Sequence, residues 1–132
     1  MKYLKLALSF LTIFPMRLDE SIEIKDLNRS AGWFPFIGLV IGGFVVLMKW
    51  GASFLFSPLV SSVLALAIWV ALSGGLHLDG LADCFDGMCA SARPERRLEI
   101  MKDPRLGTFG GVGLVLTLVL KIALLAALPA AI

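Results

Sequence analysis

Three aspartates, Asp79, Asp83 and Asp86, follow the longest uncharged stretch of the sequence. Their spacing of i, i+4 and i+7 places them on one face of a helix. Two carboxylates about 6 Å apart repel by about 3 kcal/mol at an effective dielectric of about 20, so such a face takes up protons or binds a cation. Carboxylate oxygens without thiolates or paired imidazoles suit Mg²⁺, Mn²⁺ or Ca²⁺. A solvated helix face is the simpler alternative, which the spacing alone leaves open.

Basic residues follow the acids in the segment 93–105, RPERRLEIMKDPR. Arginine carries a planar fork of donors that fits phosphate oxygens. Mg²⁺ typically takes one or two carboxylates and completes its shell with water and substrate phosphate. The combination predicts a phosphoryl-transfer site, with Asp103 as a fourth acid ligand. The alternative is that these cations only fix the topology of the flanking spans. The predicted phosphate-binding residues are Arg93, Arg97, Lys102 and Arg105, while Arg96 is not assigned.

The general base for such a reaction would be a carboxylate, such as Asp83, or His77. On an ideal helix His77 projects about 160° away from Asp79, so it joins the acids only if the helix begins after it. Otherwise it is a capping or interfacial histidine. Cys84 and Cys89 form a CxxxxC pair. This spacing is a weak metal or disulfide signal, and we interpret the two thiols as incidental.

The elements that must position these residues are membrane helices. Hydrophobic residues make up 58% of the 132 residues, against about 45–50% in soluble domains. Nineteen residues without Asp, Glu, Lys or Arg separate Arg29 from Lys49, and twenty-nine separate Lys49 from Asp79. Both stretches reach the about 20 residues that a membrane span needs. The sequence therefore predicts an all-α, polytopic protein in the lipid bilayer, and it carries no basic, aromatic-rich run typical of nucleic-acid binding.

We predict a single membrane domain with six pieces. The apolar run near the N-terminus, Leu6–Met16, is short for a span and is followed by no small-residue cleavage site. We therefore expect an interfacial or re-entrant helix there rather than a signal peptide. Lys and Arg gather before the first span and in the segment 77–106, and the positive-inside rule places both in the cytoplasm. Lys121 lies inside the last span, either to snorkel or to pair with an acid. The pieces are an N-terminal helix (1–18), a polar loop (19–30), three spans (31–50, 53–76 and 107–129) and the catalytic segment (77–106).

The segment 77–106 has a readable local structure. We expect a helix from His77 to Ala92 and a second one with Pro94 in its first turn. The second helix ends near Asp103, because the residue before a proline avoids helical geometry. Glycines mark both borders of the segment: Gly74-Gly75 loosens the end of the second span, and GTFGGVG allows tight turns or close helix packing.

The stretches GGLHLDGLADCFDG and ERRLEIMKDPRLGTFG resemble those of the cobalamin synthase (adenosylcobinamide-GDP ribazoletransferase) family, as do FLTIFP and GWFPFIGLVIG nearer the N-terminus. The resemblance implies a Mg²⁺-dependent enzyme of the prokaryotic cytoplasmic (inner) membrane. Such an enzyme joins adenosylcobinamide-GDP to α-ribazole or its 5′-phosphate and releases GMP, the last assembly step of vitamin B12. Family members are about twice this long, so the resemblance covers an N-terminal half. A second half-chain or a homo-oligomer is the partner that this implies.

Three rival functions are weighed against this one. DCFDGMCA followed by Arg93 is similar to the DxxDGxxAR opening of CDP-alcohol phosphotransferases, which make lipids. Here, however, the arginine stands two places late and the downstream GxxxDxxxD is missing. A non-catalytic membrane half-protein is the second rival. An ion transporter is the third, and it is disfavoured because the acids lie at the edge of a span among arginines.

Overall fold

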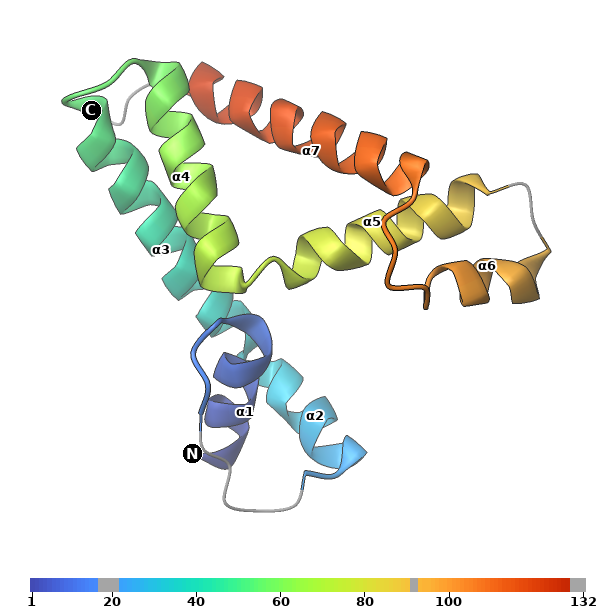
Figure 1. Cartoon of the computed structure of the whole chain (residues 1–132). Helices are drawn as coiled ribbons and strands as arrows, with labels where there is room; N and C mark the ends of the chain where they lie inside the picture. Colours follow the sequence, from blue (N-terminus) through green and yellow to red (C-terminus); the bar gives the residue numbers. More distant parts are fainter. Residues whose placement is uncertain (17–21, 91–92, 129–132) are drawn as a thin grey trace.

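The computed structural model describes residues 1–16, 22–90 and 93–128. All regular secondary structure in these ranges is helical (Figure 1), which confirms the predicted fold class. The elements are α1 (Lys2–Leu11), α2 (Ile24–Ser30), the 3-10 turn η1 (Ala31–Trp33), α3 (Phe34–Ser53), α4 (Pro58–Ser73), α5 (Leu76–Cys89), α6 (Pro94–Ile100) and α7 (Thr108–Ala127).

Two described helical stretches are long and apolar enough to cross a bilayer. One is the 30-residue run Ile24–Ser53, which joins α2, η1 and α3, and the other is the 20-residue α7. The third predicted span is α4, whose 16 residues cover only about 24 Å of an about 30 Å hydrocarbon core. It qualifies only together with α5, from which it is bent by 92°. The chain is a polytopic helical membrane protein, and the bent pair α4 and α5 makes either a broken span or a re-entrant loop.

The first span begins earlier in the chain than the sequence predicted. Residues 24–30 were expected in a polar loop, but they form α2 and lead into α3 without a break. Glu23 and Asp26 form a capping box, in which each side chain accepts a backbone N–H of the other residue. Lys2 of α1 pairs with Asp26 at 3.1 Å. These polar residues therefore begin a helix and dock α1 against it, because the first N–H groups of a helix need outside acceptors.

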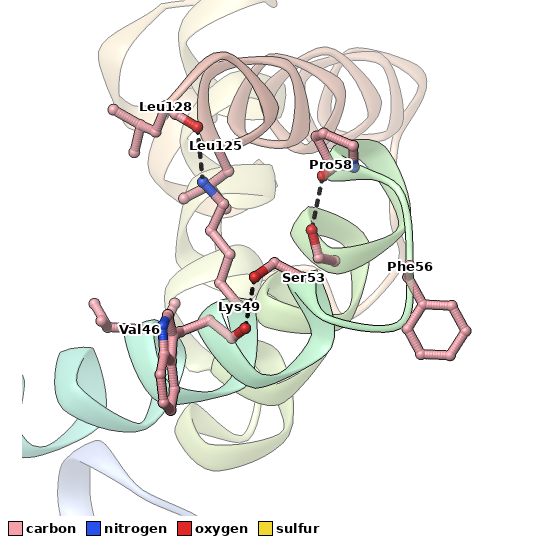
Figure 2. Close-up of a pocket in the computed structure, with 10 residues that line it drawn as sticks. Val46, Lys49, Ser53, Phe56, Pro58, Leu125 and Leu128 are labelled. Carbon is pink, nitrogen blue, oxygen red and sulfur yellow. Dashed lines mark hydrogen bonds between the residues drawn. The ribbon is translucent and has the colours of Figure 1, made fainter. Parts of the chain in front are cut away.

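Helices α3 and α4 pack along each other, and α7 contacts both α4 and α5 (Figure 1). At the end away from α5, a hollow of about 270 Å³ lies between α3, α4 and α7 (Figure 2). There Lys49 donates a hydrogen bond of 3.3 Å to the carbonyl of Leu128, the C-cap residue that follows α7. A cation at this place satisfies a terminal carbonyl and complements the negative end of the helix dipole.

The bend between α4 and α5 is made by two glycines. Gly74 and Gly75 have φ angles of 64° and 74°. Among the described residues, they are the only two with a positive φ. Residues with a Cβ adopt this left-handed region at a cost of about 1–2 kcal/mol each. A Cβ on Gly74 would also lie only 3.1 Å from the side chain of Ile13. The glycine pair thus turns the chain sharply where the sequence had indicated a loosened helix end.

Gly74→Ala should therefore lower the free energy of unfolding by about 1–2 kcal/mol, because alanine is strained at a positive φ. The thermal unfolding midpoint in detergent measures the change. Gly43→Ala in α3 is the matched control, since a Cβ there meets nothing within 4 Å. Equal midpoints for the two variants would contradict this account of the turn.

Candidate active site at the contact of helices α5 and α7

Helix α5 carries the three predicted acids, and the structure treats them differently. Asp79 is exposed and Asp83 is half-buried. Within the described residues, no hydrogen bond or ion pair engages either carboxylate. Asp79 lines a hollow of about 490 Å³, which is bounded by the α4–α5 turn, by Leu106 before α7 and by Leu114 within α7. These two acids are one helical turn apart and remain available to a ligand.

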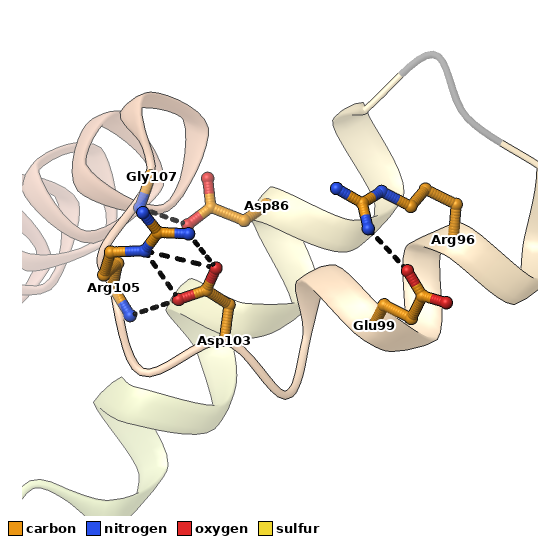
Figure 3. A network of polar contacts seen from close by, with 6 residues as sticks. All are labelled: Asp86, Arg96, Glu99, Asp103, Arg105 and Gly107. Atoms are coloured by element: carbon orange, nitrogen blue, oxygen red, sulfur yellow. Dashed lines mark hydrogen bonds and ion pairs between the residues drawn. The ribbon is translucent and has the colours of Figure 1, made fainter.

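Asp86 binds the start of α7 instead. Its Oδ2 accepts a hydrogen bond from the backbone N–H of Gly107, and its Oδ1 accepts one from Gly110, both at 2.8 Å. Figure 3 shows the first of these. The N–H of Gly110 is one of those that a helix cannot satisfy itself, and the positive end of the helix dipole favours an anion there. Asp86 is thus the N-terminal cap of α7, supplied from another helix.

Glycines bring α7 close enough for this contact. A Cβ on Gly107 or Gly110 would collide with the carboxylate of Asp86, and one on Gly113 would collide with the ring of Phe85. Gly110 also lies against the backbone of α5, since its Cβ would stand 2.9 Å from a carbonyl oxygen there. The prediction that the GTFGGVG glycines allow close helix packing is confirmed.

Asp103 is held by its neighbour Arg105 rather than by α5. The guanidinium of Arg105 donates from Nη2 to Oδ2 at 2.7 Å and from Nε to Oδ1 at 3.0 Å (Figure 3). The Arg105 backbone N–H adds a bond of 3.1 Å to Oδ1. These side-chain and backbone hydrogen bonds lower the pKa of Asp103 from 3.8 to about 2. Asp103 therefore orients Arg105 in this structure.

The other predicted phosphate contacts surround α6. Arg93 precedes its first residue and Arg97 lies in its last turn, while Lys102 follows its end; all three side chains are exposed. Arg96 forms an ion pair with Glu99 in the same helix (Figure 3). Their role toward phosphate stays a prediction.

His77 lies apart from the acids. Its ring packs edge-on against Trp69 with centroids 6.4 Å apart, and it lines a separate hollow of about 290 Å³ with residues of α1 and α3. Trp69 also receives Lys121, whose Nζ stands 4.6 Å from the ring centroid. Lys121 thus makes a cation–π contact, which neither sequence alternative had named.

Of the four acids predicted as metal ligands, two remain available to bind a metal ion. Among the described residues, no three His, Cys, Asp or Glu side chains come together as a metal cluster. Asp86 serves α7 and Asp103 serves Arg105, which leaves Asp79 and Asp83. Two carboxylates are within the number that Mg²⁺ commonly takes from a protein. The thiols of Cys84 and Cys89 are free and exposed. The structure thus brings together a two-acid set, and the metal itself stays a prediction.

Comparison with known proteins gives a consistent family. A family model described as "Cobalamin-5-phosphate synthase" matches residues 3–132. Three relatives named "Adenosylcobinamide-GDP ribazoletransferase" come from Desulfitobacterium hafniense, Roseiflexus sp. and Herpetosiphon aurantiacus. They are 41%, 42% and 42% identical over 98%, 91% and 91% of this chain, and the matches cover 51%, 45% and 48% of their own lengths. The chain thus spans about half the length of these relatives. No solved structure matches it.

Gly113→Ala should destabilise the protein by about 1–3 kcal/mol, because the added methyl overpacks the contact with Phe85. Thermal unfolding in detergent measures this, with Gly111→Ala as control, since a Cβ there stands 3.9 Å from its nearest neighbour, Leu106. Adding Phe85→Leu should restore part of the loss. A Gly113→Ala protein as stable as the control would show that α5 and α7 are not in close contact.

Arg105→Gln should raise the pKa of Asp103 from about 2 toward 3.8, because the guanidinium bonds are lost. Because this pKa is lowered in the folded protein, the ionised carboxylate of Asp103 stabilises the folded loop at pH values above 3.8. This contribution disappears as the pH falls toward about 2. NMR titration of carboxyl-labelled aspartate measures the change. Lys102→Gln is the control, and a pKa of Asp103 that is the same in both variants would contradict the assignment.

Proposed function

The chain belongs to the cobalamin-5-phosphate synthase family, and on that basis we propose that it joins adenosylcobinamide-GDP to α-ribazole or its 5′-phosphate. GMP is released, and adenosylcobalamin or its 5′-phosphate is formed, the last assembly step of vitamin B12. The observation that carries the proposal is the pair Asp79 and Asp83, unpaired within the described residues on α5, beside the capped start of α7. The two stretches that resemble the family meet at this place.

The reaction is a displacement at phosphorus. An oxygen of the ribazole ribose attacks the phosphorus next to cobinamide, a new P–O bond forms, and the P–O bond to GMP breaks. Bound Mg²⁺, or Mn²⁺ in its place, would neutralise charge on the diphosphate. Asp79 and Asp83 would supply its carboxylate ligands. Asp83 also accepts the proton of the attacking hydroxyl, since His77 lines a different hollow.

The basic residues after α5 hold the diphosphate. Arg93, Arg97 and Lys102 are exposed around α6, so a phosphate group can reach them from water. Arg105 is oriented by the two-point contact with Asp103. Its Nη1 has no partner among the described residues, so the outer edge of the guanidinium is open to phosphate. Asp103 thus contributes by orienting Arg105, a role different from metal binding.

The site faces the cytoplasm of a prokaryotic cell from its inner membrane. The positively charged residues of the N-terminal part and of α6 favour that side. Lys49, near the α3–α4 connection, is occupied by the end of α7. A cytoplasmic site gives the nucleotide part of the substrate access from water.

The test is GMP release by the purified chain in lipid vesicles with adenosylcobinamide-GDP, α-ribazole and Mg²⁺. Asp83→Asn should lower turnover at least about 100-fold, as loss of a general base does, with unchanged expression and membrane insertion. Glu95→Gln, an exposed acid of α6, is the control and should keep wild-type activity.

Three outcomes would contradict the proposal. Near-normal turnover by Asp83→Asn would remove Asp83 from the mechanism. Release of CMP from CDP-diacylglycerol and an alcohol, without GMP release in the first assay, would instead assign a CDP-alcohol phosphotransferase. An absence of GMP from the wild-type chain would show that it does not catalyse this transfer by itself.

A further inference from the structure

Helix α5 is joined to the span before it by a turn that restrains it little. Gly74 and Gly75 form this turn, and glycine has the widest choice of backbone angles. The other end of α5 continues into the short helix α6 through residues outside the described ranges. The direction of α5 and the rotation about its axis therefore depend on what its side touches, and among the helices that it contacts α7 is the main one.

Among the described residues, the contact with α7 has one polar anchor. The two oxygens of Asp86 accept one backbone N–H each, from Gly107 and Gly110. These two amides point in fixed directions because the first turn of α7 sets them. An anchor with two points at different heights fixes both the position and the rotation of α5. Asp79 and Asp83 lie on the same helix, so their places follow from it.

We propose that Asp86 is a positioning residue: it fixes α5 on the start of α7, and in this way it sets where Asp79 and Asp83 lie. The assignment replaces the role of metal ligand that the spacing of the three acids had predicted for it. The contact itself is independent of the reaction, whereas its effect on Asp79 and Asp83 rests on the proposed function.

The alternative is that Asp86 binds a metal together with the other two acids. Both of its oxygens are already engaged at 2.8 Å, and the described residues hold no cluster of three metal-ligating side chains. Ligand and anchor differ in one testable respect. Gly110→Ala removes no carboxylate, yet its methyl would occupy the place of the Asp86 side chain. It therefore disturbs the contact with α7 but leaves the charge of Asp86 in the protein. Asp86→Asn removes that charge as well, so a metal ligand predicts the larger loss of metal affinity for Asp86→Asn.

The first measurement is hydrogen exchange of the segment 107–111, by mass spectrometry on the whole chain in nanodiscs. Asp86→Asn keeps the shape of the side chain, but its amide offers one acceptor oxygen and turns a donor toward the second N–H. Exchange should become at least about tenfold faster, in line with the loss of a hydrogen bond to a charged group. Gly110→Ala should do the same. Gly111→Ala is the control and should exchange like the wild type.

The second measurement is Mn²⁺ binding to the same proteins by electron paramagnetic resonance, without substrate. Asp79→Asn should weaken binding at least about tenfold, because it removes one of the two negative charges that attract the cation. An anchor predicts that Asp86→Asn changes the affinity no more than Gly110→Ala does. It also predicts that the double variant, with Asp86→Asn and Gly110→Ala together, binds Mn²⁺ as tightly as the single variant with the lower affinity. The reason is that the effects of two changes to one contact do not add.

Each result bears on the proposal separately from the proposed function. Unchanged exchange in Asp86→Asn would overturn the anchor whatever the activity. A loss of Mn²⁺ affinity in Asp86→Asn that exceeds the loss in Gly110→Ala tenfold would make Asp86 a ligand and overturn the assignment. If the wild type binds no Mn²⁺ but exchange responds as expected, the anchor stands and the proposed metal site at Asp79 and Asp83 fails.

Discussion

Two hydrogen bonds from the start of α7 to the carboxylate of Asp86 fasten α5, the helix that carries the candidate site residues, to α7. Helix α5 leaves α4 at 92° through a turn of two glycines, so its direction has to be fixed from outside. The carboxylate does this because it meets amides that α7 cannot satisfy and the positive end of its dipole. The glycines of α7 are the counterpart of this bond, since any side chain at Gly107 or Gly110 would displace Asp86.

Helix α7 is capped at both ends by charges that belong to other helices. Asp86 of α5 meets its start, and Lys49 of α3 meets the carbonyl that ends it. Each charge has the sign that the helix dipole favours at that end. In a bilayer, terminal amides and carbonyls find little water, so partners from neighbouring helices are worth keeping. These caps tie the last span to the first span and to the site.

The four aspartates of the segment 77–106 fall into two groups according to whether a protein group binds them. Asp86 and Asp103 bind protein groups, one the backbone of α7 and the other the side chain of Arg105. Asp79 and Asp83 are left without a partner in the part of the chain that the structure describes.

Apolar length, proline position and short motifs are local properties, and from them the sequence predicts the all-helical membrane fold, the family and the helices of the segment 77–106. Its spacing rule also put Asp79, Asp83 and Asp86 on one helix and turned His77 away from them. It missed the helical start of the first span, where polar residues cap rather than loop. The tertiary structure was needed to show that Asp86, unlike Asp79 and Asp83, accepts hydrogen bonds from α7. It was also needed to show that Asp103 binds Arg105. The periodicity of a helix says which residues share a face, whereas the partner that meets each of them comes from a distant part of the chain.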